Sequence, residues 1–190
     1  MNIDIGGGRT NVSVFSAGHQ IVWDILAVGG DKFDDAIIDF MRKKHNLLIG
    51  ARTAEELKIN IGAARMRGAK LTMNACGRSL VSGLPRAVTV NSEEMIEALD
   101  EPLRDLISAL HRIIERTPPE LVGDILQAGM TLTGGGSLLH GLDRLIERVT
   151  GIPAVVARKP ISSTVLGAGS LLPYIGSMPE GMVSVPSRVV

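Results

Sequence analysis

The sequence is poor in cysteine and in aromatic side chains, and its charges cancel. A single cysteine, Cys76, rules out an internal disulfide framework and a cysteine-based zinc cluster. Only 3% of the residues are aromatic, so the stacking platforms of single-strand nucleic-acid binders are nearly absent. The 20 lysines and arginines balance 20 aspartates and glutamates, which argues against a nucleic-acid partner or a general affinity for anionic membranes.

Long uncharged runs are also scarce. The stretch 161–178 carries no charge, but it contains Pro173 together with serines and glycines, and a spanning helix needs roughly 20 predominantly apolar residues. We therefore expect a buried helix with its exit loop there, and no membrane span. The first residues contain neither a basic segment nor an apolar run, so we expect no secretory signal.

Glycine is in excess, at 22 of 190 residues, within a globular composition that is 45% hydrophobic and 21% charged. Gly6-Gly7-Gly8 follows a strand predicted for Asn2–Ile5, and Gly134-Gly135-Gly136 follows a strand predicted for Met130–Thr133. Glycine lets backbone N–H groups approach a phosphate closely. A ligand-free hairpin explains the first run as well as phosphate binding does, and an ordinary strand-to-helix turn explains the second run better.

The apolar periodicity predicts the elements of the first half of the chain. Strands over 11–15 and 20–28 complete an antiparallel meander with the first strand. Asp31 is expected to cap one helix, and Thr53 to begin a second helix with a capping box that ends at Glu56. Strands are expected over 71–76 and 86–90.

The second half is predicted to be mostly helical. Asn91 is expected to cap a long helix with Glu94 at its third position, and Pro102 to kink that helix or to start a new one. The further expected elements are helices over 120–127, 138–149 and 163–172, the strand over 130–133, a strand over 153–157, and a disordered tail.

Glu55 and Lys58 lie three residues apart in the second predicted helix and therefore share one face. A carboxylate and an ammonium there could bind ribose hydroxyls, although most such pairs are surface ion pairs. Arg67 is predicted to lie in a solvated basic turn, and His140 on a solvated part of a helix.

Each of these signals is weak alone, but their combination resembles one family. Asp4-Ile5-Gly6-Gly7-Gly8, AEELKINIG over 54–62 and LTGGGSLLHGLDRL over 132–145 are similar to the second phosphate loop and the adenosine-contacting segments of the superfamily of actins, heat-shock chaperones and sugar kinases. The sequence between these motifs resembles, more narrowly, the bacterial actins of the MreB family. The similar segments are VGGDKFDDAI over 28–37, NLLIGARTAEELKI over 46–59, GLPRAVTV over 83–90 and ERTPPELVGDIL over 115–126.

The resemblance implies an α/β fold, namely the second, C-terminal lobe of an actin-like (ribonuclease-H-like) ATPase, with a mixed sheet flanked by helices. The core subdomain would comprise 1–28 and 91–175, a smaller α+β subdomain would be inserted over 29–90, and 176–190 would be a disordered tail. The first lobe would be missing.

The resemblance also implies ATP and Mg²⁺ as cofactors. By matching residue, the glycine turn would contact the β- and γ-phosphates, the segment around Lys58 the ribose and base, and the second glycine run the adenosine side, with Asp4 near the metal through water. The implied nucleotide-binding residues are Gly6, Gly7, Gly8, Arg9, Glu55, Glu56, Leu57, Lys58, Gly134, Gly135, Gly136, Ser137 and Leu138.

The sequence departs from the family at positions that bear on catalysis. Arg9 stands where the family has a threonine that positions the attacking water, and a guanidinium cannot take over that geometry. Asn11 and Asn60 replace glutamates. No residue is therefore assigned as catalytic, and we expect no efficient ATP hydrolysis from this chain alone.

Two functions follow from the resemblance. The first is a cytoplasmic, ATP-binding cytoskeletal protein that forms or joins membrane-associated filaments, organises wall synthesis and determines cell shape, with a RodZ-like membrane adaptor and the wall-synthesis machinery as partners. The second is a truncated or degenerate paralogue that keeps nucleotide or partner binding without polymerising. A sugar or acetate kinase is a distant third, because no residues for such a substrate are visible.

Overall fold

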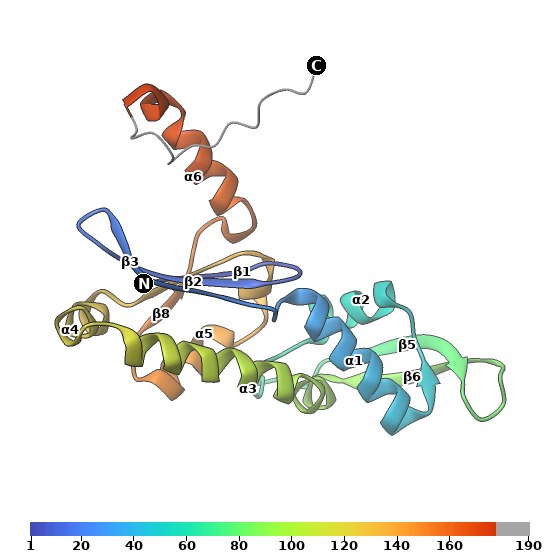
Figure 1. Cartoon of the computed structure of the whole chain (residues 1–190). Coiled ribbons are helices and arrows are strands. Elements are labelled where there is room, and N and C mark those ends of the chain that lie inside the picture. The colour runs from blue at the N-terminus through green and yellow to red at the C-terminus, as the bar shows by residue number, and fades with distance from the viewer. Residues whose placement is uncertain (178–190) are drawn as a thin grey trace, which may run out of the picture.

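The computed structural model describes residues 1–177, which form two connected sheets with helices packed around them (Figure 1). The larger sheet has the strand order β3-β2-β1-β7-β8 and consists of β1 (Asn2–Ile5), β2 (Thr10–Ser16), β3 (His19–Leu26), β7 (Met130–Thr133) and β8 (Ala154–Val156). β1 is antiparallel to β2 and parallel to β7, so the predicted mixed sheet and the predicted meander are both confirmed.

One face of the larger sheet carries the core. Ile3 and Ile5 of β1 and Val12 and Val14 of β2 alternate with polar neighbours and are at most 1% exposed. The helices α3 (Ser92–Arg116) and α5 (Leu142–Thr150) lie on the same side of the sheet, and α4 (Pro119–Ala128) follows at the end of α3 (Figure 1). Burial of the apolar alternation therefore fixes which face the helices cover.

The segment between the meander and α3 forms the smaller sheet and two helices. It contains α1 (Gly30–His45), β4 (Leu47–Leu48), α2 (Ala51–Ile61), β5 (Thr72–Ser79) and β6 (Pro85–Asn91), with the antiparallel order β4-β5-β6. Its buried residues join one continuous hydrophobic cluster with those of the larger sheet. The subdomain boundaries inferred from the resemblance stay a prediction.

The last described helix does not match its prediction. α6 (Ser163–Leu171) rises away from the larger sheet on the side opposite α3 (Figure 1), between the short 3₁₀ turns η2 (Pro160–Ser162) and η3 (Leu172–Ser177). None of its residues is buried, so the expected buried helix is wrong, because only the adjoining 3₁₀ turns contact it substantially. No helix in 1–177 is both long enough and apolar enough to span a bilayer. The predicted disordered tail lies almost wholly outside the described residues.

Two helices begin earlier than predicted, because glycine and not a polar side chain precedes each of them. Gly29 occupies the cap position of α1, and Asp31 lies inside the first turn, where a carboxylate favours the positive end of the helix dipole. Gly50 precedes α2, so the capping box predicted from Thr53 is absent. Glu56 instead pairs with Arg52 at 3.1 Å, one turn back along the same helix.

Two further boundaries differ from the prediction. α3 continues through Pro102, so no new helix starts there, and the buried Leu99 and Leu103 hold both sides of the proline in the core. The predicted helix over 138–149 is interrupted. A 3₁₀ turn, η1 (Gly135–Leu138), comes first, and α5 begins after Gly141, which has a φ of 73° that favours glycine. The two-residue strand β4 was not predicted.

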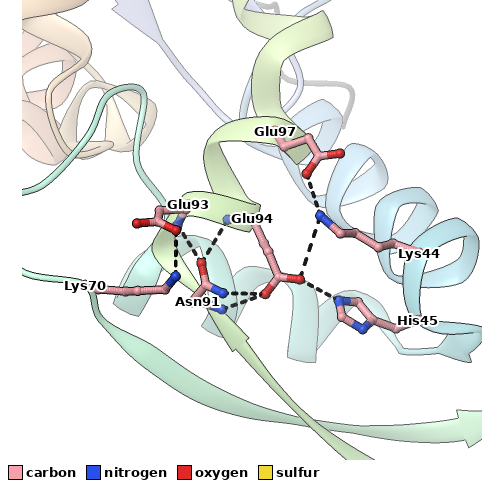
Figure 2. A network of polar contacts seen from close by, with 7 residues as sticks. All are labelled: Lys44, His45, Lys70, Asn91, Glu93, Glu94 and Glu97. Carbon is pink, nitrogen blue, oxygen red and sulfur yellow. Dashed lines mark hydrogen bonds and ion pairs between the residues drawn. The ribbon is translucent and has the colours of Figure 1, made fainter.

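The start of α3 is joined to the end of α1 by a polar network (Figure 2). The predicted capping box is confirmed: the Asn91 side chain accepts from the Glu94 N–H at 3.2 Å, and the Glu94 carboxylate accepts from the Asn91 N–H at 3.0 Å. Glu94 also contacts His45 at 2.9 Å, and Lys44 pairs with Glu97 at 2.6 Å. One carboxylate thus caps α3 and ties it to α1.

We expect Asn91→Ala to lower the free energy of unfolding by about 1 kcal/mol, because the first turn of α3 loses its side-chain acceptor. Chemical denaturation followed by circular dichroism measures this. Asn91→Ser is the matched control, since serine also caps and should stay near the wild type. Equal destabilisation by both substitutions would contradict the capping role.

Candidate functional site

The two glycine runs meet at one edge of the larger sheet. β1 and β7 are parallel neighbours, with Ile3 opposite Leu132, so the segments that follow their carboxyl ends leave the sheet side by side. The approach is close enough to require glycine. A β-carbon at Gly134, where φ is 79°, would lie 2.2 Å from the Ile5 carbonyl oxygen.

The first glycine turn is held against the start of α1. The Gly30 N–H donates to the Gly6 carbonyl and the Asp31 N–H donates to the Gly7 carbonyl, each at 2.9 Å. A β-carbon at Gly29 would lie 2.4 Å from the Gly7 carbonyl oxygen. The smaller, inserted part of the chain therefore begins in direct backbone contact with this turn.

Lys58 connects α2 to the same corner. Its ammonium donates to the Asp34 carboxylate at 2.7 Å and to the Gly30 carbonyl at 3.0 Å, and both charged side chains are largely buried. Burial raises the pKa of Asp34, and the hydrogen bond and charge of Lys58 oppose that rise. The second Asp34 oxygen, Oδ1, is buried with no partner in the described part of the chain.

A cavity of about 650 Å³ opens between these elements. Its walls come from the first glycine turn, the first turns of α1, one face of α2, the loop after α2, and the segment from η1 to His140. The lining residues are Gly6, Gly7, Gly30, Asp31, Phe33, Asp34, Ala51, Arg52, Glu55, Lys58, Ile59, Arg67, Gly135, Gly136, Leu138, Leu139, His140 and Ile161. Seven of the thirteen nucleotide-binding residues implied by the resemblance lie there, namely Gly6, Gly7, Glu55, Lys58, Gly135, Gly136 and Leu138.

The other implied residues lie outside the cavity wall. Leu57 is fully buried in the core, and Glu56 pairs with Arg52, which does line the cavity. Ser137 is buried and donates to the Gly134 carbonyl at 2.7 Å, so it shapes the second glycine loop from behind. Gly8 and Arg9 are exposed beyond the turn.

Asp4 lies next to the second glycine loop. Its carboxylate accepts a hydrogen bond from the Thr133 hydroxyl at 3.0 Å. No group of three or more histidine, cysteine or acidic side chains gathers to hold a metal ion within 1–177. A magnesium ion here would need phosphate oxygens and water for most of its ligands, which is its usual mode of binding.

The sequence reasoning missed two cavity residues, one from the loop after α2 and one from the segment between η1 and α5. Arg67 was predicted to be solvated, but it lines the cavity and donates to the Gly62 carbonyl at 2.9 Å. His140 is exposed, as predicted, but it precedes α5 instead of lying on a helix, and it pairs with Ala63 in an isolated bridge. Partial desolvation, then the charge of Arg67, lower the pKa of His140. No local sequence pattern predicts that the loop after α2 contacts the segment before α5.

Asp31 and Asp34 were also missed, although they stand in the expected first helix. Helical spacing places Asp31 and Asp34, three residues apart, on one face of the helix, and the sequence can show this. The sequence cannot show that Asp34 pairs with Lys58 of another helix. The cavity combines backbone turns at one end, charged side chains along α2, and an apolar wall that includes Leu138 and Ile161. This arrangement suits an elongated ligand with an anionic end, a hydroxyl-rich middle and a flat apolar part.

Comparisons with known proteins agree with the resemblance. A model of the family described as MreB/Mbl protein matches residues 1–179. The cell shape-determining protein MreB of Escherichia coli strain K12 is 45% identical over 175 residues, which are 92% of this chain and 50% of that protein. The cell shape-determining protein Mbl of Bacillus subtilis strain 168 is 40% identical over 184 residues, 97% of this chain and 55% of that protein.

Solved structures give the same result for the fold. MreB5 of Spiroplasma citri bound to AMPPNP is 33% identical with a TM-score of 0.90, over 93% of this chain and 53% of that chain. A chain of the MamK double helical filament is 20% identical with a TM-score of 0.72, over 90% of this chain and 53% of that chain, which shows the fold alone.

The chain spans about half the length of the relatives it matches. The match to the family model nevertheless runs almost from end to end of the chain, and the identity to curated relatives is well above the level at which only the fold is shared. The chain therefore belongs to the MreB/Mbl family and has the actin-like fold of that family.

Proposed function

We propose that this chain binds ATP in the cavity between the two glycine loops and α2, as part of an MreB-type cytoskeletal protein. The observation that carries the proposal is the convergence of Gly6-Gly7, Gly135-Gly136 and the Glu55–Lys58 face of α2 on one cavity. A relative of similar fold, MreB5 of Spiroplasma citri, has been solved bound to AMPPNP and to ADP. That supports an adenine nucleotide as the ligand.

The cavity offers a suitable surface for each part of a nucleotide. The backbone at Gly6 and Gly7 would face the phosphates, Glu55 and Lys58 the ribose and base, and Leu138 the adenosine. Gly135 leaves room for a ligand, because a β-carbon there would meet no atom within 4 Å. Lys58 is already held by Asp34, so little side-chain ordering would be needed on binding.

Asp4 would hold Mg²⁺ through water, and a second carboxylate lies near the phosphate end. A β-carbon at Gly7 would be 3.4 Å from Asp31 Oδ1, so this carboxylate borders the glycine turn. A negative group beside the β- and γ-phosphates repels free ATP but tolerates the magnesium complex. Mg²⁺–ATP is therefore the form proposed to bind.

For the whole family protein, ATP binding would control assembly into membrane-associated filaments in the cytoplasm. Those filaments would organise wall synthesis and thereby cell shape, through a RodZ-like membrane adaptor and the wall-synthesis machinery. The alternative is a truncated or degenerate paralogue with residual nucleotide or partner binding and no polymerisation. The observation that favours it is Arg9, which stands where the resemblance expects a threonine.

We expect the 190-residue chain to bind ATP with a dissociation constant weaker than about 1 μM, because it matches only about half of its relatives' length and the resemblance assigns part of the cleft to the other half. Gly135→Val should weaken binding at least about tenfold, because the new side chain would occupy part of the cavity that Gly135 lines, and its β-carbon meets no protein atom within 4 Å. Isothermal titration with Mg²⁺–ATP measures both values. Gly123→Val is the matched control, since Gly123 is an exposed residue of α4 outside the cavity whose added β-carbon also meets no atom within 4 Å. An equal loss in both variants would contradict the assigned site.

We expect no efficient ATP hydrolysis by the 190-residue chain itself, because the resemblance places the water-polarising glutamate in the half of its relatives that the chain does not match, and Arg9 stands in place of threonine. Arg9→Thr should therefore not restore turnover. Phosphate release in a malachite-green assay tests this, with an intact homologue as the positive control. Turnover of the wild-type chain near that of the homologue would refute the expectation.

Sedimentation decides between the two functions. If the chain itself forms filaments, Mg²⁺–ATP should move it into the pellet on ultracentrifugation, and Gly135→Val should stay in the supernatant. If it is the paralogue without polymerisation, it stays soluble with and without ATP while titration still detects binding. Pelleting that is independent of nucleotide would contradict ATP control of assembly.

A further inference from the structure

Glu55 presents a free carboxylate on the wall of the cavity. No residue of 1–177 forms a hydrogen bond or an ion pair with it. Two cations stand one helical turn away in α2, Arg52 before Glu55 and Lys58 after it, and side chains three apart on a helix are neighbours. Each cation is bound elsewhere. Arg52 pairs with Glu56 at 3.1 Å, and Lys58 pairs with a residue of α1.

The partner of Lys58 holds it firmly. The Lys58 ammonium donates to Asp34 at 2.7 Å and to the Gly30 carbonyl at 3.0 Å. The side chains of Asp34 and Lys58 are only 14% and 16% exposed, so water screens this pair far less than it screens a surface pair. Both acceptors belong to α1, which packs against α2 (Figure 1). Lys58 is therefore committed to α1 and is not available to Glu55.

Glu55 nevertheless lies near this buried pair. Burial raises the pKa of Asp34, the hydrogen bond and charge of Lys58 oppose the rise, and the nearby charges of Glu55 and Asp31 add to it. A free carboxylate on a cavity wall repels a phosphate and favours a neutral group that can donate a hydrogen bond. The wall at Glu55 therefore suits the uncharged, hydroxyl-bearing part of a ligand.

The donors and acceptors at this point match hydroxyl groups. A carboxylate only accepts hydrogen bonds, and an ammonium, with three N–H groups, only donates them. Two of the Lys58 N–H groups are used by Asp34 and Gly30, and Lys58 lines the cavity beside Glu55. A hydroxyl can donate to the carboxylate and accept from the remaining N–H. Two neighbouring hydroxyls of a sugar would use both carboxylate oxygens.

We propose that Asp34 is a positioning residue that keeps Lys58 from pairing with Glu55, and so leaves Glu55 free to bind the ribose hydroxyls of the nucleotide. This rests on the proposed function, which supplies the nucleotide. Asp34 itself does not contact the ligand, because its Oδ2 holds Lys58 and its Oδ1 is buried. Without Asp34, Lys58 turns to Glu55, one helical turn away, and the acceptor for the hydroxyls is lost.

Isothermal titration with Mg²⁺–ATP and with Mg²⁺–2′,3′-dideoxy-ATP, which lacks both hydroxyls, measures the contact. We expect the wild type to prefer ATP at least about tenfold, because hydrogen bonds to charged groups are strong. Glu55→Ala should abolish this preference. Asp34→Ala should reduce it below about threefold with little change in dideoxy-ATP affinity. Asp35→Ala is the matched control: Asp35 is exposed on the same helix outside the cavity, so the preference should persist.

A double variant separates positioning from a general effect on the fold. In Asp34→Ala/Lys58→Met no ammonium remains to capture Glu55, so the preference for ATP should return to at least about half of the wild-type ratio. A merely structural role of Asp34 would weaken both nucleotides alike and would show no recovery in the double variant. An unchanged preference in Asp34→Ala, or no recovery in the double variant, would overturn the positioning role.

The wild-type titrations distinguish failure of this positioning role from failure of the proposed function. A wild-type chain that binds neither nucleotide contradicts both. A wild-type chain that binds ATP and dideoxy-ATP equally well, and loses both on Gly135→Val, contradicts the ribose contact and leaves the nucleotide site standing.

Discussion

The parallel pairing of β1 with β7 is the contact on which the rest of the site depends. It joins strands that lie about 130 residues apart in the chain and places both glycine loops at one edge of the sheet, as the Asp4–Thr133 hydrogen bond across 129 positions illustrates. Gly134 then packs its backbone against the Ile5 carbonyl, a distance that no side chain permits. The cavity exists because these two backbones approach so closely.

The inserted part of the chain completes the cavity through contacts of a different kind. The start of α1 donates two backbone hydrogen bonds to the glycine turn, and Lys58 holds α2 to α1 through Asp34 and Gly30. At the far end of α1, Glu94 connects His45 to the cap of α3. The walls are therefore positioned from both ends of α1, and the geometry is preorganised before any ligand arrives.

Much of the fold could be predicted from local patterns. The alternation in β1 and β2 and the capping box at Asn91 gave the correct elements, because each depends on residues close together in the chain. The segments that resemble the family's nucleotide-contacting segments located the cavity. They did not show which of their residues line it and which lie behind or outside it. Helical periodicity does so in the structure, where Glu55 and Lys58 face the cavity and Leu57 faces the core.

The remaining features depend on tertiary contacts that the sequence does not report. Arg67 and His140 line the cavity because the loop after α2 docks on the segment before α5. The exposure of α6 likewise cannot be predicted from its composition. An uncharged apolar segment is expected to be buried, and the composition does not show whether another element packs against it. The starts of α1 at Gly30 and of α2 at Ala51 were not predicted, because the residue before each helix is a glycine, which has no capping side chain.

The central claim is that one cavity, built by both glycine loops and α2, is the nucleotide site. Titration of the ¹⁵N-labelled chain with Mg²⁺–AMPPNP, followed by backbone amide chemical shifts, tests it most directly. The account predicts shifts confined to Gly6, Gly7, Glu55, Lys58, Gly135, Gly136 and their neighbours, with β3 and α6 unchanged. Shifts that concentrate on β3 or α6, or none at millimolar nucleotide, would contradict it.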